Sequence, residues 1–133
     1  MKAKATSEEL QKGFAKHLEE TNRHVERLEK AFESIDAKPK RMTCEGMKGL
    51  LKEGDKAMKE SEKGSVMDAA MIAAAQRVEH YEMAGYGTAV EYANLMEHTE
   101  AAELLSQTLE EERMTDEKLS TIAETVNDQA NDM

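Results

Sequence analysis

Apolar side chains recur every three or four residues from Leu10 to Phe32, which places them on one face of an α-helix. Just before this run, Thr6 and Glu9 have the spacing of a capping box, so we predict that the helix begins there. Pro39 has no backbone N–H and disfavours helical geometry in the residue before it, so the helix should end within "SIDAKPKR". A helix of this length must bury its apolar face against other elements.

Similar periodic patterns fill the rest of the chain. They predict a shorter helix capped by Thr43 and ending near Ser61, a long helix from Val66 to about Met96 introduced by the capping pair Ser65 and Asp68, and a helix capped by Thr99 that ends before a polar tail starting at about residue 127. Aromatic residues make up only 4% of the chain, which also favours helices over sheets. We therefore predict an all-α fold in one domain, residues 1–133: a bundle of three long helices and one short helix.

Charge and cysteine usage exclude several classes of protein. The net charge is −10 with acidic and basic residues interspersed, which argues against a nucleic-acid-binding surface. Cys44 is the single cysteine, so the chain has no internal disulfide, and we interpret this residue as structural in a reducing compartment. The sequence shows no apolar run of signal-peptide or membrane-spanning length, and we expect a soluble cytoplasmic protein.

Two glutamates interrupt the apolar face of the predicted helix over residues 66–96. At about 100° per residue, Glu79 and Glu82 fall near the centre of the same sector as Met71, Ile72 and other apolar side chains, so they should point into the core. His80 projects to the opposite side, where we expect it to be exposed. A carboxylate that is buried alone is very costly, so these must be protonated, paired with a cation or bound to a metal.

Further donors lie on the other two long helices. On the last helix, Glu112 falls at the centre of the apolar face, with Glu111 and Asp116 on its two flanks. On the first helix, His17, Glu20 and His24 cluster along one flank of the apolar stripe. Of these, His17 lies nearest the interior and Glu20 lies at the edge of the stripe. Oxygen and nitrogen donors therefore come from three separate helices.

This donor set is typical of one chemical class of metal. Carboxylates with a minor share of imidazole suit iron or manganese, whereas structural zinc sites usually include thiolates. Glutamates three residues apart on one helix, facing a glutamate on the next, can hold two cations inside a bundle. A single E-x-x-E motif is common on acidic helices, and lone histidines at a core margin are more often satisfied by hydrogen bonds. The prediction of a di-metal centre therefore depends on the shared orientation of Glu79, Glu82 and Glu112.

The sequence resembles the YciF-like bacterial stress proteins of the ferritin-like di-metal carboxylate superfamily. The similar stretches are "HLEETNRHVERLE", "KRMTCEGMKGLL", "DAAMIAAAQRVEHYEMAGYGT" and "AAELLSQTLEEERMTDEKL", and together they span most of residues 5–125. The resemblance implies a ferritin-like bundle and a connection with general or osmotic stress.

The resemblance also implies a ligand set. Glu20 corresponds to the second-helix ligand of that superfamily, Glu79 and Glu82 to its third-helix ligands, and Glu112 to its fourth-helix ligand. The superfamily usually places a histidine three residues after the glutamate on the second and fourth helices, but here those positions hold Arg23 and Thr115. His24 or His17 can substitute on the first of these two helices, and Asp116 on the other.

YciF-like proteins begin with an additional helix, which this sequence lacks. Without it, one side of the bundle would be open, and we expect a second copy of the chain or a rearranged short helix to cover it. The expected assembly is a homodimer or higher homo-oligomer, formed by helix exchange or with a site completed across the interface. The alternative is that the site is incomplete and unable to hold two metals.

Two hypotheses for function follow. The first is a cytoplasmic stress protein that binds iron or manganese, as a dinuclear centre, and reacts the reduced metal with oxygen or peroxide. The alternative is a metal-free helical interaction module, acting as a homo-oligomer, whose inward carboxylates are neutral or paired with Arg and Lys.

Overall fold

The computed structural model describes residues 1–132, and within that range every regular element is helical. Its elements are the short 3-10 helix η1 (Lys2–Lys4) and the α-helices α1 (Glu8–Ser34), α2 (Glu45–Glu60), α3 (Ser65–Leu95) and α4 (Thr99–Asn131). The prediction of an all-α bundle with three long helices and one short helix is therefore confirmed. No helix in the described range has the length and apolar character needed to cross a membrane.

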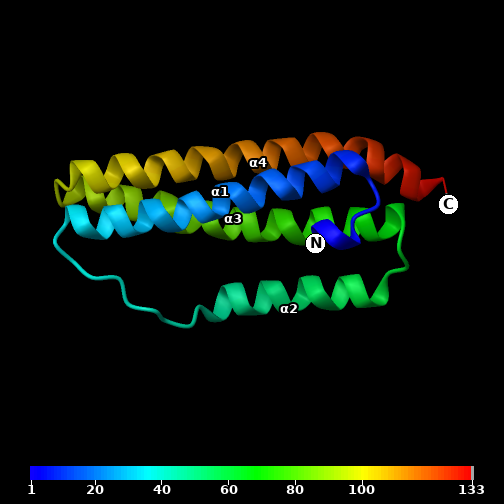
Figure 1. Cartoon of the computed structure of the whole chain (residues 1–133), viewed down its shortest axis with the longest axis horizontal. Coiled ribbons are helices and arrows are strands. Elements are labelled where there is room, and N and C mark those ends of the chain that lie inside the picture. Colours follow the sequence, from blue (N-terminus) through cyan, green and yellow to red (C-terminus); the bar gives the residue numbers. More distant parts are fainter. Residues whose placement is uncertain (133) are drawn as a thin grey trace.

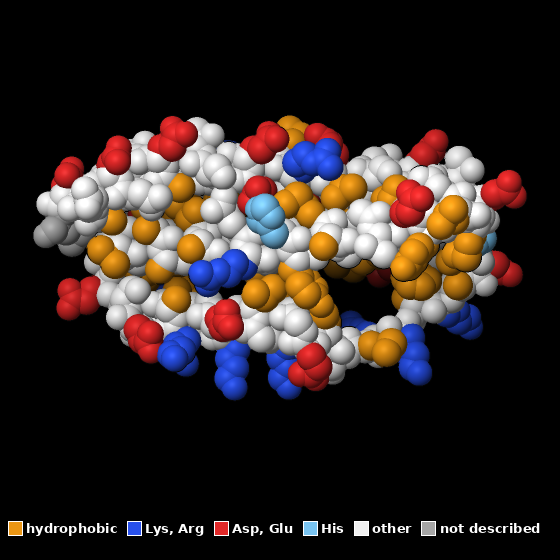
Figure 2. All heavy atoms as spheres, turned by 180° about the vertical axis from the view of Figure 1, so that it is seen from behind, with side chains coloured by type: hydrophobic (Ala, Val, Ile, Leu, Met, Phe, Trp, Pro, Cys, Tyr) orange, Lys and Arg blue, Asp and Glu red, His pale blue; other side chains and the backbone are white. Residues whose placement is uncertain are grey.

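The helices are arranged so that α4 packs against both α1 and α3, while α2 packs on α3 (Figure 1). α1 and α3 run in the same direction and α4 runs opposite to both. Two consecutive long helices that run in parallel need a return segment, and the linker of residues 35–44 followed by α2 provides it. The space-filling view shows an opening between that linker and the body of the bundle (Figure 2).

The helix termini differ from the predicted caps by about one residue. Ser7, and not Thr6, is the N-cap of α1, and its Oγ accepts a hydrogen bond of 3.3 Å from the backbone N–H of Leu10. Cys44 replaces Thr43 as the N-cap of α2, without a side-chain capping bond. The capping boxes were misassigned because a spacing motif fixes the neighbourhood of a helix start but not the residue that leaves helical geometry.

The starts of α3 and α4 also differ from prediction. Gly64 is the N-cap of α3 with a φ of 140°, a conformation that favours glycine, and Ser65 is already the first helical residue. His98 is the N-cap of α4, so Thr99 lies inside that helix. The polar residues expected to form a tail from about 127 continue α4 to Asn131.

Asp68 does not form the predicted cap and instead ties α3 to the start of α1. Its Oδ1 and Oδ2 accept hydrogen bonds from the backbone N–H groups of Thr6 and Ser7, each 2.7 Å long, and the residue is only 2% exposed. Charge-assisted bonds of this kind satisfy backbone donors that would otherwise be unpaired at a helix start. The carboxylate therefore anchors the N-terminal segment to the bundle.

The apolar core is divided into two parts along the bundle. A large cluster at the end near the start of α1 contains Leu10, Met71, Leu119, Ile122 and Val126, and a smaller cluster at the opposite end consists of alanines from α1, α3 and α4. The predicted glutamates lie on the helices between these two clusters. A polar layer thus interrupts the core at its middle.

One side of α1 is poorly covered. Leu18 is 62% exposed and Val25 is 52% exposed, although both continue the apolar periodicity of the helix. The reason is that α1 packs on α4 through the side that carries Glu20 and His24, and not through the side that carries these two residues.

Candidate metal centre

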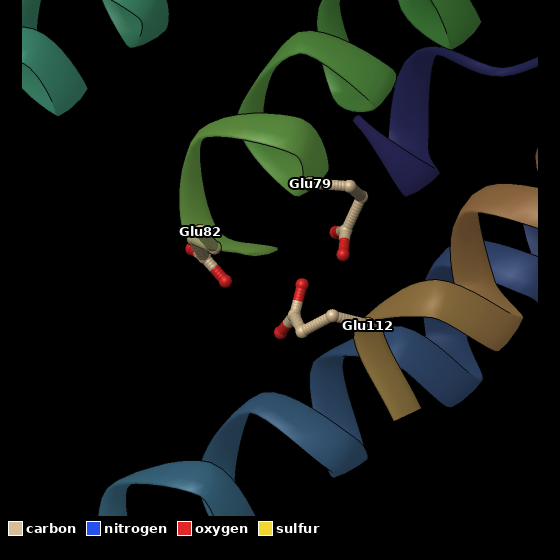
Figure 3. Close-up of side chains that lie close together, drawn as sticks. All are labelled: Glu79, Glu82 and Glu112. Carbon is tan, nitrogen blue, oxygen red and sulfur yellow. The ribbon is translucent and has the colours of Figure 1, made fainter. Parts of the chain in front are cut away.

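Three glutamates from two antiparallel helices meet in the polar layer. Glu79 and Glu82 come from successive turns of α3 and point toward Glu112 of α4 (Figure 3). One carboxylate oxygen from each of the three can be chosen so that all lie within 4.8 Å of one another. Glu79 is 2% exposed, Glu112 is 1% exposed and Glu82 is half-buried. The three residues, which we call the glutamate triad, are those that the helical phase predicted to point inward.

Protons are shared unequally within the glutamate triad. Burial, reinforced by the charge of Glu112, raises the pKa of Glu79 to about 10 and that of Glu82 to about 8. Burial opposes ionisation of Glu112 as well, but its close contacts with His24, Glu79 and Glu82 outweigh it and lower its pKa to about 2. Near neutral pH the metal-free triad therefore holds one carboxylate and two protonated carboxyl groups.

Each of two histidines on α1 contacts one member of the triad. His17 Nε2 lies 3.0 Å from Glu79 Oε1, and His24 Nδ1 lies 3.0 Å from Glu112 Oε1. Burial lowers the pKa of His17. Burial also disfavours the charged form of His24, but its contacts with Glu112 and Glu111 outweigh this and raise its pKa. α1 thus places imidazoles against both helices that carry the triad.

The predicted order of burial on α1 is wrong. His24 is 4% exposed and Glu20 is 8% exposed, whereas the side chain of His17 is 27% exposed, so His17 is not the residue nearest the interior. The cause is the position of α4, which covers the side of α1 that carries Glu20 and His24. Thr115 of α4 donates a hydrogen bond of 3.2 Å to Glu20 Oε2.

Asp116 and Glu111, on the two flanks of α4, contact other residues. Asp116 Oδ1 lies 3.1 Å from Nε2 of His80 and is not part of the triad. His80 is exposed, as predicted, with its side chain against this carboxylate. Glu111 forms an ion pair with Arg27 of α1, and this pair together with His24 lowers the pKa of Glu111 despite its partial burial.

Sequence reasoning missed Arg27. Its guanidinium also donates a hydrogen bond of 3.3 Å to Oγ1 of the buried Thr108, so it joins α1 to α4 beside the triad. Arg27 follows His24 by three residues, which is the spacing of neighbours on one helix face, and that spacing was the available signal.

The unsatisfied atoms of this layer fit a cation. Several buried side-chain atoms have no hydrogen-bond partner among the described residues: Glu79 Oε2, Glu111 Oε1, both carboxylate oxygens of Glu112, Asp116 Oδ1, His17 Nδ1 and His24 Nε2. Buried polar atoms are rarely left without partners, and a cation could satisfy those gathered in this layer. The set is rich in carboxylate oxygen with a minor share of imidazole, as hard or borderline metal ions prefer.

Fold and site together define a class: a helical bundle whose core is interrupted by a layer of buried carboxylates and imidazoles. The particular family is shown by sequence. Residues 1–131 match the family described as a domain of unknown function, DUF892, and the chain belongs to this family.

Relatives in the same family are similar over most of this chain. The chain is 49% identical over 123 residues to Protein YciF of Escherichia coli strain K12, a match that covers 91% of this chain and 74% of YciF. The crystal structure of the E. coli stress protein YciF matches with a TM-score of 0.91 and 44% identity, covering 96% of this chain and 80% of that chain. The structure of YcfI from Rhodopseudomonas palustris matches with a TM-score of 0.87 and 39% identity, covering 90% and 76% of the two chains.

Proposed function

We propose that this protein is a stress-associated, ferritin-like di-metal carboxylate protein that binds iron or manganese through Glu79, Glu82 and Glu112. The observation that supports this most directly is the meeting of three inward carboxylates within 4.8 Å, two of them buried with oxygens that lack hydrogen-bond partners among the described residues. The description of YciF as a stress protein supports the physiological part of the proposal.

Charge balance favours a cation at this position. Without metal, Glu79 and Glu82 must hold protons to lie beside Glu112, because three negative charges at this separation in a buried layer would repel strongly. Divalent cations can replace those protons and neutralise the carboxylates. The cations would also bind the carboxylate oxygens that lack hydrogen-bond partners, which protons alone do not satisfy.

The remaining predicted ligands surround the triad in different ways. His17 and His24 each lie against one triad carboxylate and can supply nitrogen, while Glu20 faces the same interior from α1. Asp116 lies on the flank of α4 next to His80, so we assign it the least direct role of the predicted ligands. Arg27 would hold Glu111 away from the metal by pairing with it.

The proposed activity is the consumption of oxidants. When bound in the reduced state, the metal pair would supply electrons to dioxygen or to a peroxide. This chain's own contribution would be to flank the centre with the two apolar clusters and to fix Glu112 as a carboxylate through His24. We place this activity in the cytoplasm, in accord with the single, exposed, unpaired cysteine.

The exposed side of α1 supports a homodimer or higher homo-oligomer. Leu18 and Val25 are more than half exposed on a helix whose opposite side is buried, and a second copy would remove them from water.

The Arg27–Glu111 pair favours the rival function, a metal-free interaction module. In this pair a basic side chain of α1 neutralises a carboxylate of α4 beside the triad without any metal.

Metal content separates the two functions. Protein purified without chelator should contain iron or manganese, up to two ions per chain by elemental analysis, and Glu79→Ala and Glu112→Ala should each lose most of it. Glu110→Ala is a matched control because Glu110 is exposed on the same helix and pairs with Arg113. Substoichiometric metal that neither triad variant changes, in protein that retains its helical circular dichroism, would favour the metal-free module.

A further inference from the structure

A pocket of about 260 Å³ leads from the surface to one member of the glutamate triad. Its walls are formed by α1 and α4, and Ala75 and Glu79 of α3 lie among its lining residues. Exposed side chains, those of Lys16, Met114 and Lys118, lie at its outer end, whereas Glu79 is 2% exposed. The pocket therefore connects solvent with the polar layer.

Most of the wall between these two ends is apolar. Phe14, Leu119 and Ile122 are buried residues of the larger core cluster and also line the pocket. The space exists because Gly13 and Ala75 present almost no side chain to it. A smaller cavity of about 150 Å³ with apolar walls is enough to bind benzene in another protein, so this one has room for an aromatic ring with a branched substituent.

The inner end offers two polar groups without partners in the described chain. Glu79 Oε2 and His17 Nδ1 are both buried without a hydrogen-bond partner, and both residues line the pocket. A ligand group that both donates and accepts hydrogen bonds, such as a hydroxyl or a hydroperoxide, would satisfy them. The pocket thus combines apolar walls with two polar atoms that a bound ligand would satisfy.

The charges around the inner end select a neutral molecule. An anion would lie beside the carboxyl groups of Glu20, Glu79 and Glu111 between largely apolar walls, which is unfavourable. An organic cation would lose its hydration between the apolar side chains of Phe14, Leu119 and Ile122. Neither kind of charge therefore gains enough to offset its loss of hydration.

We propose that this pocket binds a small neutral organic molecule with an apolar body and one hydroxyl or hydroperoxide group directed at Glu79 and His17. This inference extends the proposed function by naming organic hydroperoxides as the class of oxidant. The reaction with a hydroperoxide therefore rests on the proposed function. In that reaction the O–O bond would break, and ROOH would take up two protons and two electrons, which two bound ferrous ions would supply, to give ROH and water. Hydrogen peroxide has no apolar body to fill the pocket.

Binding is tested first, without metal. The probe is 2-phenylpropan-2-ol, the alcohol that corresponds to cumene hydroperoxide, titrated into metal-free protein and followed by amide chemical shifts in NMR. We expect saturable binding that shifts amides of residues 13–20 and 111–122. The amine analogue, 2-phenylpropan-2-amine, should bind at least roughly tenfold more weakly at neutral pH because its charge must be desolvated.

Variants that fill the pocket give an independent test. A Cβ atom at Gly13 would lie 3.7 Å from Ile122 Cδ1, an ordinary contact, so Gly13→Leu can be accommodated and should weaken alcohol binding at least roughly tenfold by occupying the space. Ala75→Leu fills the same pocket from α3. Gly87→Leu is the matched control, since nothing lies within 4 Å of a Cβ at that helical position.

The two proposals fail in different ways. Absence of saturable alcohol binding to folded wild-type protein, or equal binding of the alcohol and the amine, would overturn the inference whatever the metal content. If the protein binds no metal but binds the alcohol, only the proposed function fails. With iron loaded, Gly13→Leu should slow the consumption of cumene hydroperoxide more than that of hydrogen peroxide, and equal slowing of both would count against the named oxidant class.

Discussion

His24 Nδ1 on α1 lies 3.0 Å from Glu112 Oε1 on α4, and both residues are almost fully buried. The imidazole favours the charged form of Glu112 and so helps to place the negative charge of the triad on that residue, while Glu79 and Glu82 keep their protons. A single contact between two helices thus influences which carboxyl group of the triad is ionised.

The stability of the metal-free protein should fall as the pH rises. Glu79 and Glu82 have raised folded-state pKa values, so their contribution is fully present below about 4.5 and is lost as the pH rises toward about 8 and about 10. We expect the free energy of unfolding in urea to be lower at pH 8.5 than at pH 6 by up to about 6 kcal/mol, since each group that is protonated only in the folded state contributes about 1.4 kcal/mol per pH unit. Glu79→Gln, which cannot ionise, should reduce this difference by roughly half, and an unchanged pH dependence would contradict the assigned protonation.

Metal binding should release protons. A cation that enters the triad replaces the protons of Glu79 and Glu82, so Mn²⁺ should raise the melting temperature more at pH 8 than at pH 6. Isothermal titration calorimetry in buffers of different ionisation enthalpy counts the released protons. Glu112→Ala should show neither effect, and release of no protons by the wild-type protein would be inconsistent with a metal at this position.

Removal of the Asp68 carboxylate should loosen the N-terminal segment. Asp68→Ala deletes two hydrogen bonds of 2.7 Å to the backbone of Thr6 and Ser7, and we expect a loss of about 2 to 4 kcal/mol of unfolding free energy. Hydrogen exchange should accelerate at the amides of these two residues. Asp55→Ala, at an exposed position on α2, is the control and should change stability by less than about 0.5 kcal/mol.

Charges on the open side of α1 should prevent self-association. If a second copy covers Leu18 and Val25, the double variant Leu18→Glu and Val25→Glu should be monomeric by analytical ultracentrifugation at concentrations where the wild-type protein is a dimer. Leu51→Glu, which changes a similarly exposed leucine on α2, should leave the assembly intact. A wild-type protein that remains monomeric throughout the accessible concentration range would disprove the proposed dimer.

Cys44 should react faster than an ordinary exposed thiol near neutral pH. Its Sγ lies 3.1 Å from the hydroxyl of Tyr81, and this hydrogen bond lowers the pKa of the thiol. Gly46 leaves room for the contact, since a Cβ there would lie 2.5 Å from the tyrosine oxygen. The pH profile of alkylation by iodoacetamide should shift to higher pH in Tyr81→Phe, and Tyr92→Phe, which changes an exposed tyrosine elsewhere on α3, should leave it unchanged.

The inward orientation of Glu79, Glu82 and Glu112 could be predicted because phase within one helix is fixed by its period. The relations between helices could not be predicted in this way. Which face of α1 is buried depends on where α4 lies, and the prediction therefore placed His17, instead of His24, nearest the interior. Asp68 was misassigned for the same reason, because its partners are on another element and not in its own helix.

The crossover through α2 has a consequence for biosynthesis. It separates α1 from α3 and α4, so the histidines of the site leave the ribosome well before the glutamates that they contact. Capture of metal by the proposed centre would therefore be a late event, after α4 has docked. A nascent chain that is still attached would expose only part of that set to the metal ions of the cell.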